Sequence, residues 1–463
     1  MQRSWRGNLI AAFAAQGAAL GVSLLTSLVV PRLLVEVEAF AYWQLFVFYS
    51  NYVSLAQLGL VDGLYLRLGG RGLEGLEAGR LHGQYRLYLA FQLLAGLLLA
   101  GWQAFQPDAG RRFVWFAAAA YLVLYNASRF LGYLFLAAGH TRVFSASSLL
   151  DRGVMLGCVC LLLAGQVRDW RLFVLAVPLA MGGSLVWLGY RSRFLLAAAP
   201  QSGAARACLA DIRRGLPVTA ATLAGALVTG AGKLTADAGW GLEAFGQVSF
   251  ALSLAAVLLA FLNQAGLVLF PALRRIDAPA RRAALYARLR RGLALALLAA
   301  YGLVLPASAL VRLWLPAYAQ SAAWFVQLAP LCLFDGKMQL LYSTFLKALH
   351  RQKALLWLNL LAAGISVGGC LLAAWSGRLG GIVAAVVAAS AVRAMLAEWY
   401  LHRRCGLPGG GWLAVELAGT AVFYLLGRLG VWAAAGVWTA LYLAGLGILW
   451  TRRRKRDGSD RMQ

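Results

Sequence analysis

Long runs of apolar residues fill almost this entire chain, and only short polar segments separate them. A bilayer core about 30 Å thick requires about 20 apolar residues per helix. The pattern therefore predicts an all-α polytopic membrane protein with about fourteen transmembrane helices. The expected spans are residues 7–30, 39–61, 84–105, 113–138, 144–166, 170–190, 216–238, 245–270, 292–315, 322–346, 354–376, 380–401, 411–427 and 430–450.

Composition supports this class. The 463 residues are 61% hydrophobic and 13% charged, whereas a soluble protein of this length needs far more polar surface. The apolar run that begins near residue 7 is too long for a cleaved signal peptide, so it is interpreted as the first span. The extramembrane segments are short, which argues against a soluble catalytic domain on either side.

The net charge of +26 raises the question of nucleic acid. With both termini inside, however, the basic residues concentrate in the cytoplasmic segments, which is the bias that orients membrane helices. We therefore expect a multi-pass membrane protein with cytoplasmic termini and no nucleic-acid partner. The basic clusters are interpreted as topology anchors that also contact anionic lipid. They are Arg274, Arg275, Arg281, Arg282, Arg288, Arg290 and Arg291, and residues 452–456.

The six Cys and four His predict neither a disulfide framework nor a metal site. The cysteines fall in spans or on the inner side, and the histidines lie at inner helix ends away from carboxylates. No cofactor is expected.

The chain contains an internal repeat. Residues 38–40 and 243–245 both read Glu-Ala-Phe, and residues 135–140 and 345–350 both read Phe-Leu-x-Ala-x-His. The pairs are collinear at a nearly constant offset, which indicates two six-helix copies of the same orientation. The predicted parts are a lobe over 1–190, a cytoplasmic linker over 191–215, a lobe over 216–401, two additional helices over 402–450 and a basic tail over 451–463.

Cationic side chains occur at hydrocarbon depth, where a full charge costs roughly 3 kcal/mol on insertion scales. Such residues usually face a protein interior or a watery cavity, so they predict a cation-lined path and an anionic substrate. The candidates are Arg129, Arg152, Lys233, Lys337 and Arg393.

Local pairing is an alternative for several of these cations. Lys233 has Asp237 four residues later and is close enough to the outer end of its span to snorkel. Arg152 adjoins Asp151, and Arg393 has Glu398 nearby, so both are candidates for internal ion pairs.

Polar residues recur as stripes at helical spacing along six of the predicted spans. In the internal repeat, these six spans correspond as first with seventh, second with eighth and fourth with tenth. Such stripes are best buried against a cavity or another helix. We therefore expect a path lined by these six helices. Its candidate polar residues are Asn51, Asn126, Thr229 and Gln264, and its candidates for coupling to H⁺ or Na⁺ are Asp237 and Asp335.

Several junctions resemble those of oligosaccharide flippases of the O-antigen type. These form the polysaccharide-transport branch of the multidrug/oligosaccharidyl-lipid/polysaccharide (MOP) exporter superfamily. The resemblance rests on residues 30–34 with 38–44, 233–234 with 243–247, 270–274, 313–318 and 349–353, and it covers roughly residues 1–400.

This resemblance implies two lobes that face a central basic cavity with alternating access. The implied substrate is a polyprenyl-pyrophosphate-linked oligosaccharide, moved to the outer leaflet for O-antigen, capsule or exopolysaccharide synthesis alongside other polysaccharide-assembly proteins. The related lipid II flippase has two extra C-terminal helices that form a groove for the polyprenyl tail, and the two additional helices here are candidates for the same role.

Other functions stay open at this point. A drug exporter of the same superfamily carries cations, which an excess of Arg and Lys repels. A polytopic glycan polymerase or ligase is an enzyme with sizeable outer loops, and the outer connections here are short. We therefore expect a transporter and not an enzyme.

Overall fold

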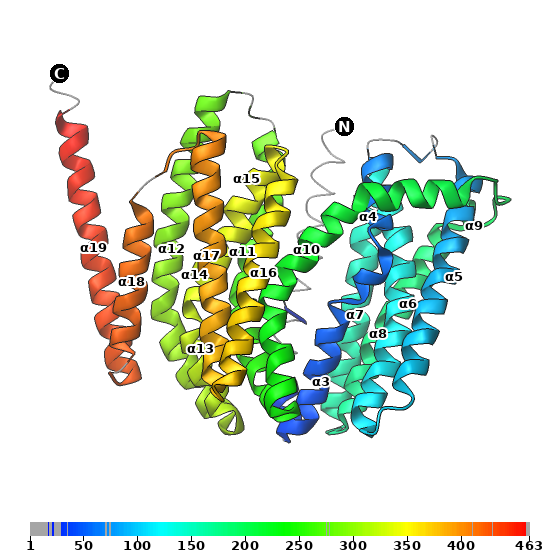
Figure 1. Ribbon diagram of the computed structural model, residues 1–463, viewed down its shortest axis with the longest axis horizontal. Coiled ribbons are helices and arrows are strands. Elements are labelled where there is room, and N and C mark those ends of the chain that lie inside the picture. The colour runs from blue at the N-terminus through cyan, green and yellow to red at the C-terminus, as the bar shows by residue number, and fades with distance from the viewer. Residues whose placement is uncertain are drawn as a thin grey trace. The chain divides into compact units, whose positions relative to one another are not determined.

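The computed structural model describes residues 17, 21–22, 29–34, 36–69, 72–73, 76–274, 276, 278–409, 411–427 and 429–459. Within these ranges, the side chains of 258, 260–272, 274 and 448–459 are not described. The described residues are helical and include no β-strand, which confirms the predicted all-α class (Figure 1). Most of the first expected span, 7–30, and the side chain of Gln264 lie outside this description.

The chain divides into two compact units, 1–250 with 352–363, and 251–351 with 364–463. The first unit holds α2 (Val30–Leu33), α3 (Val37–Ser50), η1 (Val53–Gln57), α4 (Leu60–Leu68), α5 (Ala78–Gln103), α6 (Ala109–Ala137), α7 (Thr141–Ala164), α8 (Trp170–Arg191), α9 (Arg193–Leu196) and α10 (Ala204–Trp240). The second holds α12 (Pro279–Trp314), η3 (Pro316–Tyr318), α13 (Ala319–Gln327), α14 (Ala329–Lys337), η4 (Met338–Tyr342), α15 (Ser343–Ala348), α17 (Leu379–Cys405), α18 (Trp412–Leu426) and α19 (Val431–Ser459). The boundary between the units passes through α11 (Leu242–Arg274) and α16 (Gln352–Trp375).

Eight of the described helices are long and apolar enough to cross a membrane, namely α5, α6, α7, α8, α10, α12, α16 and α17. Three shorter apolar stretches, 242–257, 412–426 and 431–447, coincide with further expected spans. The expected spans 39–61 and 322–346 are each built from consecutive shorter helices. The spacing of apolar runs thus located the helices, while it did not reveal these interruptions.

The expected helix over 39–61 is interrupted in its middle. Helix α3 ends at Ser50, the 3₁₀ turn η1 follows, and Leu58 and Gly59 then adopt φ angles of +51° and +83° before α4 begins. Left-handed conformations of this kind suit glycine, and they end a right-handed helix. The polar stripe predicted for one continuous helix over 39–61 therefore does not continue from α3 into α4.

Helix α4 is in close contact with α10, and both helices are labelled in Figure 1. A Cβ atom on Gly63 would lie 1.8 Å from the carbonyl oxygen of Asp211, and one on Gly215 would lie 1.9 Å from that of Gly59. Small residues allow this close approach between membrane helices. Helix α10 was predicted to open the second lobe, and here it packs within the first compact unit.

The apolar core of the first unit surrounds α6. Its buried residues Phe130, Leu131 and Leu134 pack with Leu64 of α4 and Tyr85 of α5. This packing fixes the face of α6 that carries the candidate site residues described below.

Candidate functional site

Arg129 lies in the C-terminal third of α6 within a box of aromatic rings. The carbon of its guanidinium is 4.9 Å from the ring centre of Tyr125, 5.8 Å from that of Tyr133 and 5.9 Å from that of Phe144. Tyr125 and Tyr133 flank Arg129 at four-residue spacing, so all three share one face of α6, while Phe144 comes from α7. Each cation–π contact contributes about 0.5–2 kcal/mol, depending on desolvation. The box holds the guanidinium in place without neutralising it.

Among the described residues, no carboxylate lies within 4 Å of Arg129, so its charge has no ion-pair partner there. The side chain is only partly buried. An arginine at this depth without a carboxylate is costly unless an anion or water reaches it. The site is therefore suited to a ligand with negative charge.

Arg152 and Asp151 of α7 extend this positive region. The Arg152 Nε atom is 3.6 Å from a carboxylate oxygen of Asp151, and the Arg152 side chain is 46% exposed. The charges of both Arg152 and Arg129 act on Asp151. Arg152 and Arg129 thus have one aspartate, Asp151, in their neighbourhood, so this part of α6 and α7 carries more positive than negative charge. The predicted pairing of Arg152 with Asp151 is present, but it does not neutralise the group.

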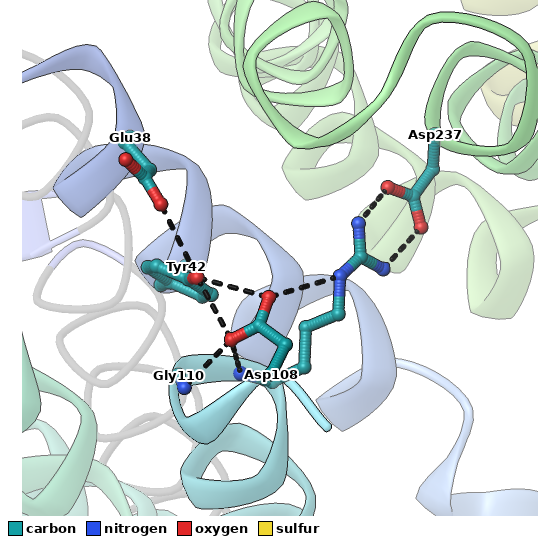
Figure 2. A network of polar contacts seen from close by, with 6 residues as sticks. Glu38, Tyr42, Asp108, Gly110 and Asp237 are labelled. Atoms are coloured by element: carbon teal, nitrogen blue, oxygen red, sulfur yellow. Dashed lines mark hydrogen bonds and ion pairs between the residues drawn. The ribbon is translucent and has the colours of Figure 1, made fainter. Parts of the chain in front are cut away.

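Asp237 pairs with Arg111 and not with Lys233 (Figure 2). The Arg111 guanidinium donates to both carboxylate oxygens, at 2.8 Å and 2.5 Å. The alternative that Lys233 pairs with Asp237 is therefore wrong in this structure. Lys233 is partly buried and forms no ion pair with any described residue, so it is a second uncompensated cation in the first unit.

The Arg111–Asp237 pair belongs to a polar network that joins α3, α6 and α10 at one end of the unit (Figure 2). Asp108 caps α6 by accepting from the backbone N–H groups of Gly110 and Arg111 at 2.7 Å and 3.0 Å. The Tyr42 hydroxyl of α3 lies 3.0 Å from both oxygens of Asp108. Capping by aspartate is worth about 1 kcal/mol. Both carboxylate oxygens of Asp237 therefore accept hydrogen bonds from Arg111, which is itself part of this network.

The two candidate cations of the second unit are paired with buried carboxylates. Lys337, at the end of α14, donates to Glu416 of α18, and Arg393 of α17 donates to Asp335 of α14. Asp335 also accepts from the side-chain amide of Gln339. Asp335 and Lys337 do not neutralise each other, because each has a partner on another helix. Their charges are balanced in this conformation.

Arg290 differs from its predicted role as a topology anchor. It is 3% exposed and donates to Glu398 of α17, whose other oxygen accepts from the Tyr342 hydroxyl at 2.7 Å. Arg290 and Glu416 were not predicted from the sequence to be buried charges. Glu416 is an isolated carboxylate within an apolar span, so the cost of burying a charge was the signal that would have found it.

The predicted polar residues of the path are mostly engaged within the fold. Asn126 is buried, donates to the Val53 carbonyl at 3.0 Å and to Gln92 at 2.7 Å, and accepts from Gln57 at 2.9 Å. Thr229 donates to a carbonyl of its own helix at 3.3 Å, and Asn51 is exposed where α3 ends. Asn126 is therefore a structural link between η1, α5 and α6 in this structure.

Several solved structures share this fold. The lipid II flippase MurJ, in an inward closed conformation, matches with a TM-score of 0.68 at 10% identity, over 96% of this chain and 99% of that one. An inward-facing multidrug resistance MATE family transporter of the MOP superfamily matches with a TM-score of 0.64 at 13% identity, over 84% and 98%. A eukaryotic MATE transporter matches with a TM-score of 0.55 at 14% identity, over 90% and 96%.

No protein-family profile matches the sequence, and no curated protein does. At these identities the structural likeness establishes the fold alone, which is that of MOP superfamily transporters. The three proteins reported are transporters and not enzymes. Together with its apolar helices, the fold makes this chain a multi-pass membrane protein.

Proposed function

We propose that this protein is a flippase of the bacterial inner membrane with cytoplasmic termini. It moves a polyprenyl-pyrophosphate-linked anionic oligosaccharide to the outer leaflet for cell-surface polysaccharide synthesis. Transport proceeds by alternating access between lobes formed by residues 1–190 and 216–401. The fold shared with the lipid II flippase and the MATE transporters supports this class of mechanism.

The observation that carries the proposal is the uncompensated positive charge of the first unit. Arg129, Arg152 and Lys233 lie on membrane-spanning helices, and their only ion-pair partner within 4 Å among the described residues is Asp151. Arg binds phosphate through two parallel N–H donors, and such bonds strengthen where water is scarce. A pyrophosphate is therefore a fitting occupant.

The aromatic box adds a reason for choosing Arg129 as the central residue. The cation–π contacts with Tyr125, Tyr133 and Phe144 hold the Arg129 guanidinium in place without a carboxylate, so its charge is available to an anion. Lys337 and Arg393 are assigned to the framework of the second unit in this conformation, since both are neutralised by buried carboxylates.

The alternative within the same fold is the export of small molecules, since one structural neighbour is a multidrug resistance transporter. A cationic drug meets repulsion from the excess charge around Arg129. Export of a cationic drug therefore requires that the charges of Arg129 and Arg152 be screened from the drug. Binding of a pyrophosphate requires that these charges be accessible.

Reconstitution tests the proposal. Purified protein in liposomes is given a fluorescent polyprenyl-pyrophosphate oligosaccharide, and translocation is followed by protection from an impermeant quencher. We expect Arg129→Gln to lower the rate at least tenfold, while Arg129→Lys retains part of it. Arg312→Gln is the matched control, because it removes one positive charge from an exposed position in the last turn of α12.

Wild-type translocation by well-folded Arg129→Gln would contradict the assigned role of Arg129. Transport of a cationic dye without any lipid translocation would favour the small-molecule exporter instead.

A further inference from the structure

An open apolar groove runs between α7 and α8 in the first unit, with a volume of about 550 Å³. This size falls within the range of about 300–1,000 Å³ that is typical of small-molecule sites. Aliphatic side chains, one glycine and one tryptophan form its walls. They are Ala146, Leu149, Leu150, Gly153 and Val154 of α7, and Trp187 of α8.

The floor of this α7–α8 groove is shaped by Gly153. No atom lies within 4 Å of the place where a Cβ on Gly153 would stand, so the glycine is not required for close helix packing. It leaves open space beside α7 instead. Helix α7 thus presents a smooth apolar channel within its membrane-spanning length.

Arg152 immediately precedes the groove residue Gly153 on α7, although it is not one of the residues that line the groove. It is eleven residues from Thr141, the first residue of the helix, which corresponds to about 17 Å at 1.5 Å per residue. Its side chain is 46% exposed, and its carboxylate neighbour is Asp151 at 3.6 Å. A half-exposed cation therefore lies near the middle of α7, on the flank of the helix next to its groove face.

The depth of Arg152 along α7 indicates which kind of lipid can bring negative charge to this residue. The phosphate of a resident phospholipid stays near the surface, about 15 Å from the centre of a 30 Å core. Only a lipid whose anionic headgroup is being carried across brings negative charge to the depth of Arg152. The charge of this residue and the apolar groove together fit such a lipid.

We infer that the α7–α8 groove guides the isoprenoid tail of the lipid-linked substrate while Arg152 pairs with its pyrophosphate during the crossing. This inference rests on the proposed function and specifies where the lipid moiety travels. It assigns the tail to the first unit, and not to α18 and α19 as the count of fourteen helices suggested.

Site-specific photo-crosslinking tests this placement. A benzophenone amino acid at position 153 is compared with the same group at Leu161, which is on α7, 74% exposed and outside the groove. The full-length protein in nanodiscs receives radiolabelled undecaprenyl pyrophosphate. We expect labelling at 153 that is competed by unlabelled polyprenyl pyrophosphate but not by polyprenol, and that falls at least tenfold in Arg152→Gln.

Equal labelling at 153 and 161, or equal labelling by polyprenol, would show ordinary lipid contact and overturn the inference. So would labelling confined to a probe at Leu425 of α18. If any of these outcomes is accompanied by saturable, pyrophosphate-dependent binding to the protein, the inference about the groove fails but the proposed function stands. Absence of any saturable binding removes the proposed function as well.

A second pair of variants tests the groove without a crosslinker. Gly153→Trp fills open space, and Leu161→Trp makes a similar change on the same helix outside the groove. We expect Gly153→Trp alone to raise the KM for the lipid substrate at least fivefold, with an unchanged Tm. Arg152→Lys restores part of the activity lost in Arg152→Gln. Equal KM values for the two Trp variants would overturn the inference.

Discussion

The Lys337 ammonium donates to the carboxylate of Glu416, and the two side chains are only 1% and 0% exposed. The contact joins the end of α14 to α18, the first of the two helices that have no counterpart in the internal repeat. A cation that the sequence suggested for substrate binding thus anchors an appended helix to the second unit. This changes what substitutions at Lys337 are expected to do.

Lys337→Met is expected to destabilise the protein by about 3–5 kcal/mol, because it leaves the buried Glu416 charge without a partner. The double variant Lys337→Met/Glu416→Gln is expected to be more stable than this single variant. The free energy of unfolding in detergent provides the measurement. A single variant as stable as the wild type would show that Glu416 readily finds another partner.

The Arg111–Asp237 pair gives a test by double-mutant cycle. Contacting charged residues usually couple by about 0.5–3 kcal/mol, so Arg111→Gln and Asp237→Asn are expected to be non-additive in unfolding free energy. The matched cycle of Lys233→Gln with Asp237→Asn is expected to show a smaller coupling, because Asp237 pairs with Arg111 and not with Lys233. Strong coupling of Asp237 to Lys233 and none to Arg111 would restore the pairing that four-residue spacing suggests.

Gly63 has no room for a side chain at the crossing of α4 and α10. Gly63→Ala is expected to cost about 1–3 kcal/mol, since a methyl group forces two backbones apart. Gly182→Ala on α8 is the control, because no atom lies within 4 Å of its would-be Cβ. The two Tm values, measured side by side, check this. Equal Tm values would mean that the crossing tolerates separation.

Hydrophobic periodicity was sufficient to locate the helices, because a membrane-spanning segment needs a long apolar run whatever its partners are. It did not reveal the interruption after Ser50. That break depends on the backbone conformation of Leu58 and Gly59 and on the close crossing with α10, which a single sequence does not display.

The candidate intramembrane cations were selected from the cost of placing a charge in an apolar span. The cost of burying a charge does not identify the ion-pair partner of each cation. Arg393 lies five residues from Glu398 in sequence, yet it pairs with Asp335, and Glu398 pairs with Arg290. Pairing between helices depends on packing. The sequence therefore identified Arg129 and Lys337 alike, and only the structure separates the uncompensated charge from the neutralised one.

The central claim is that the uncompensated charge around Arg129 binds an anionic lipid. Its most direct test is the equilibrium Kd of undecaprenyl pyrophosphate for the protein in nanodiscs. We predict that Arg129→Gln raises the Kd at least tenfold, which corresponds to about 1.4 kcal/mol. Arg312→Gln and the double variant Lys337→Met/Glu416→Gln are predicted to bind as the wild type does. An unchanged Kd in well-folded Arg129→Gln, or a loss of binding confined to the Lys337 variant, would contradict the account.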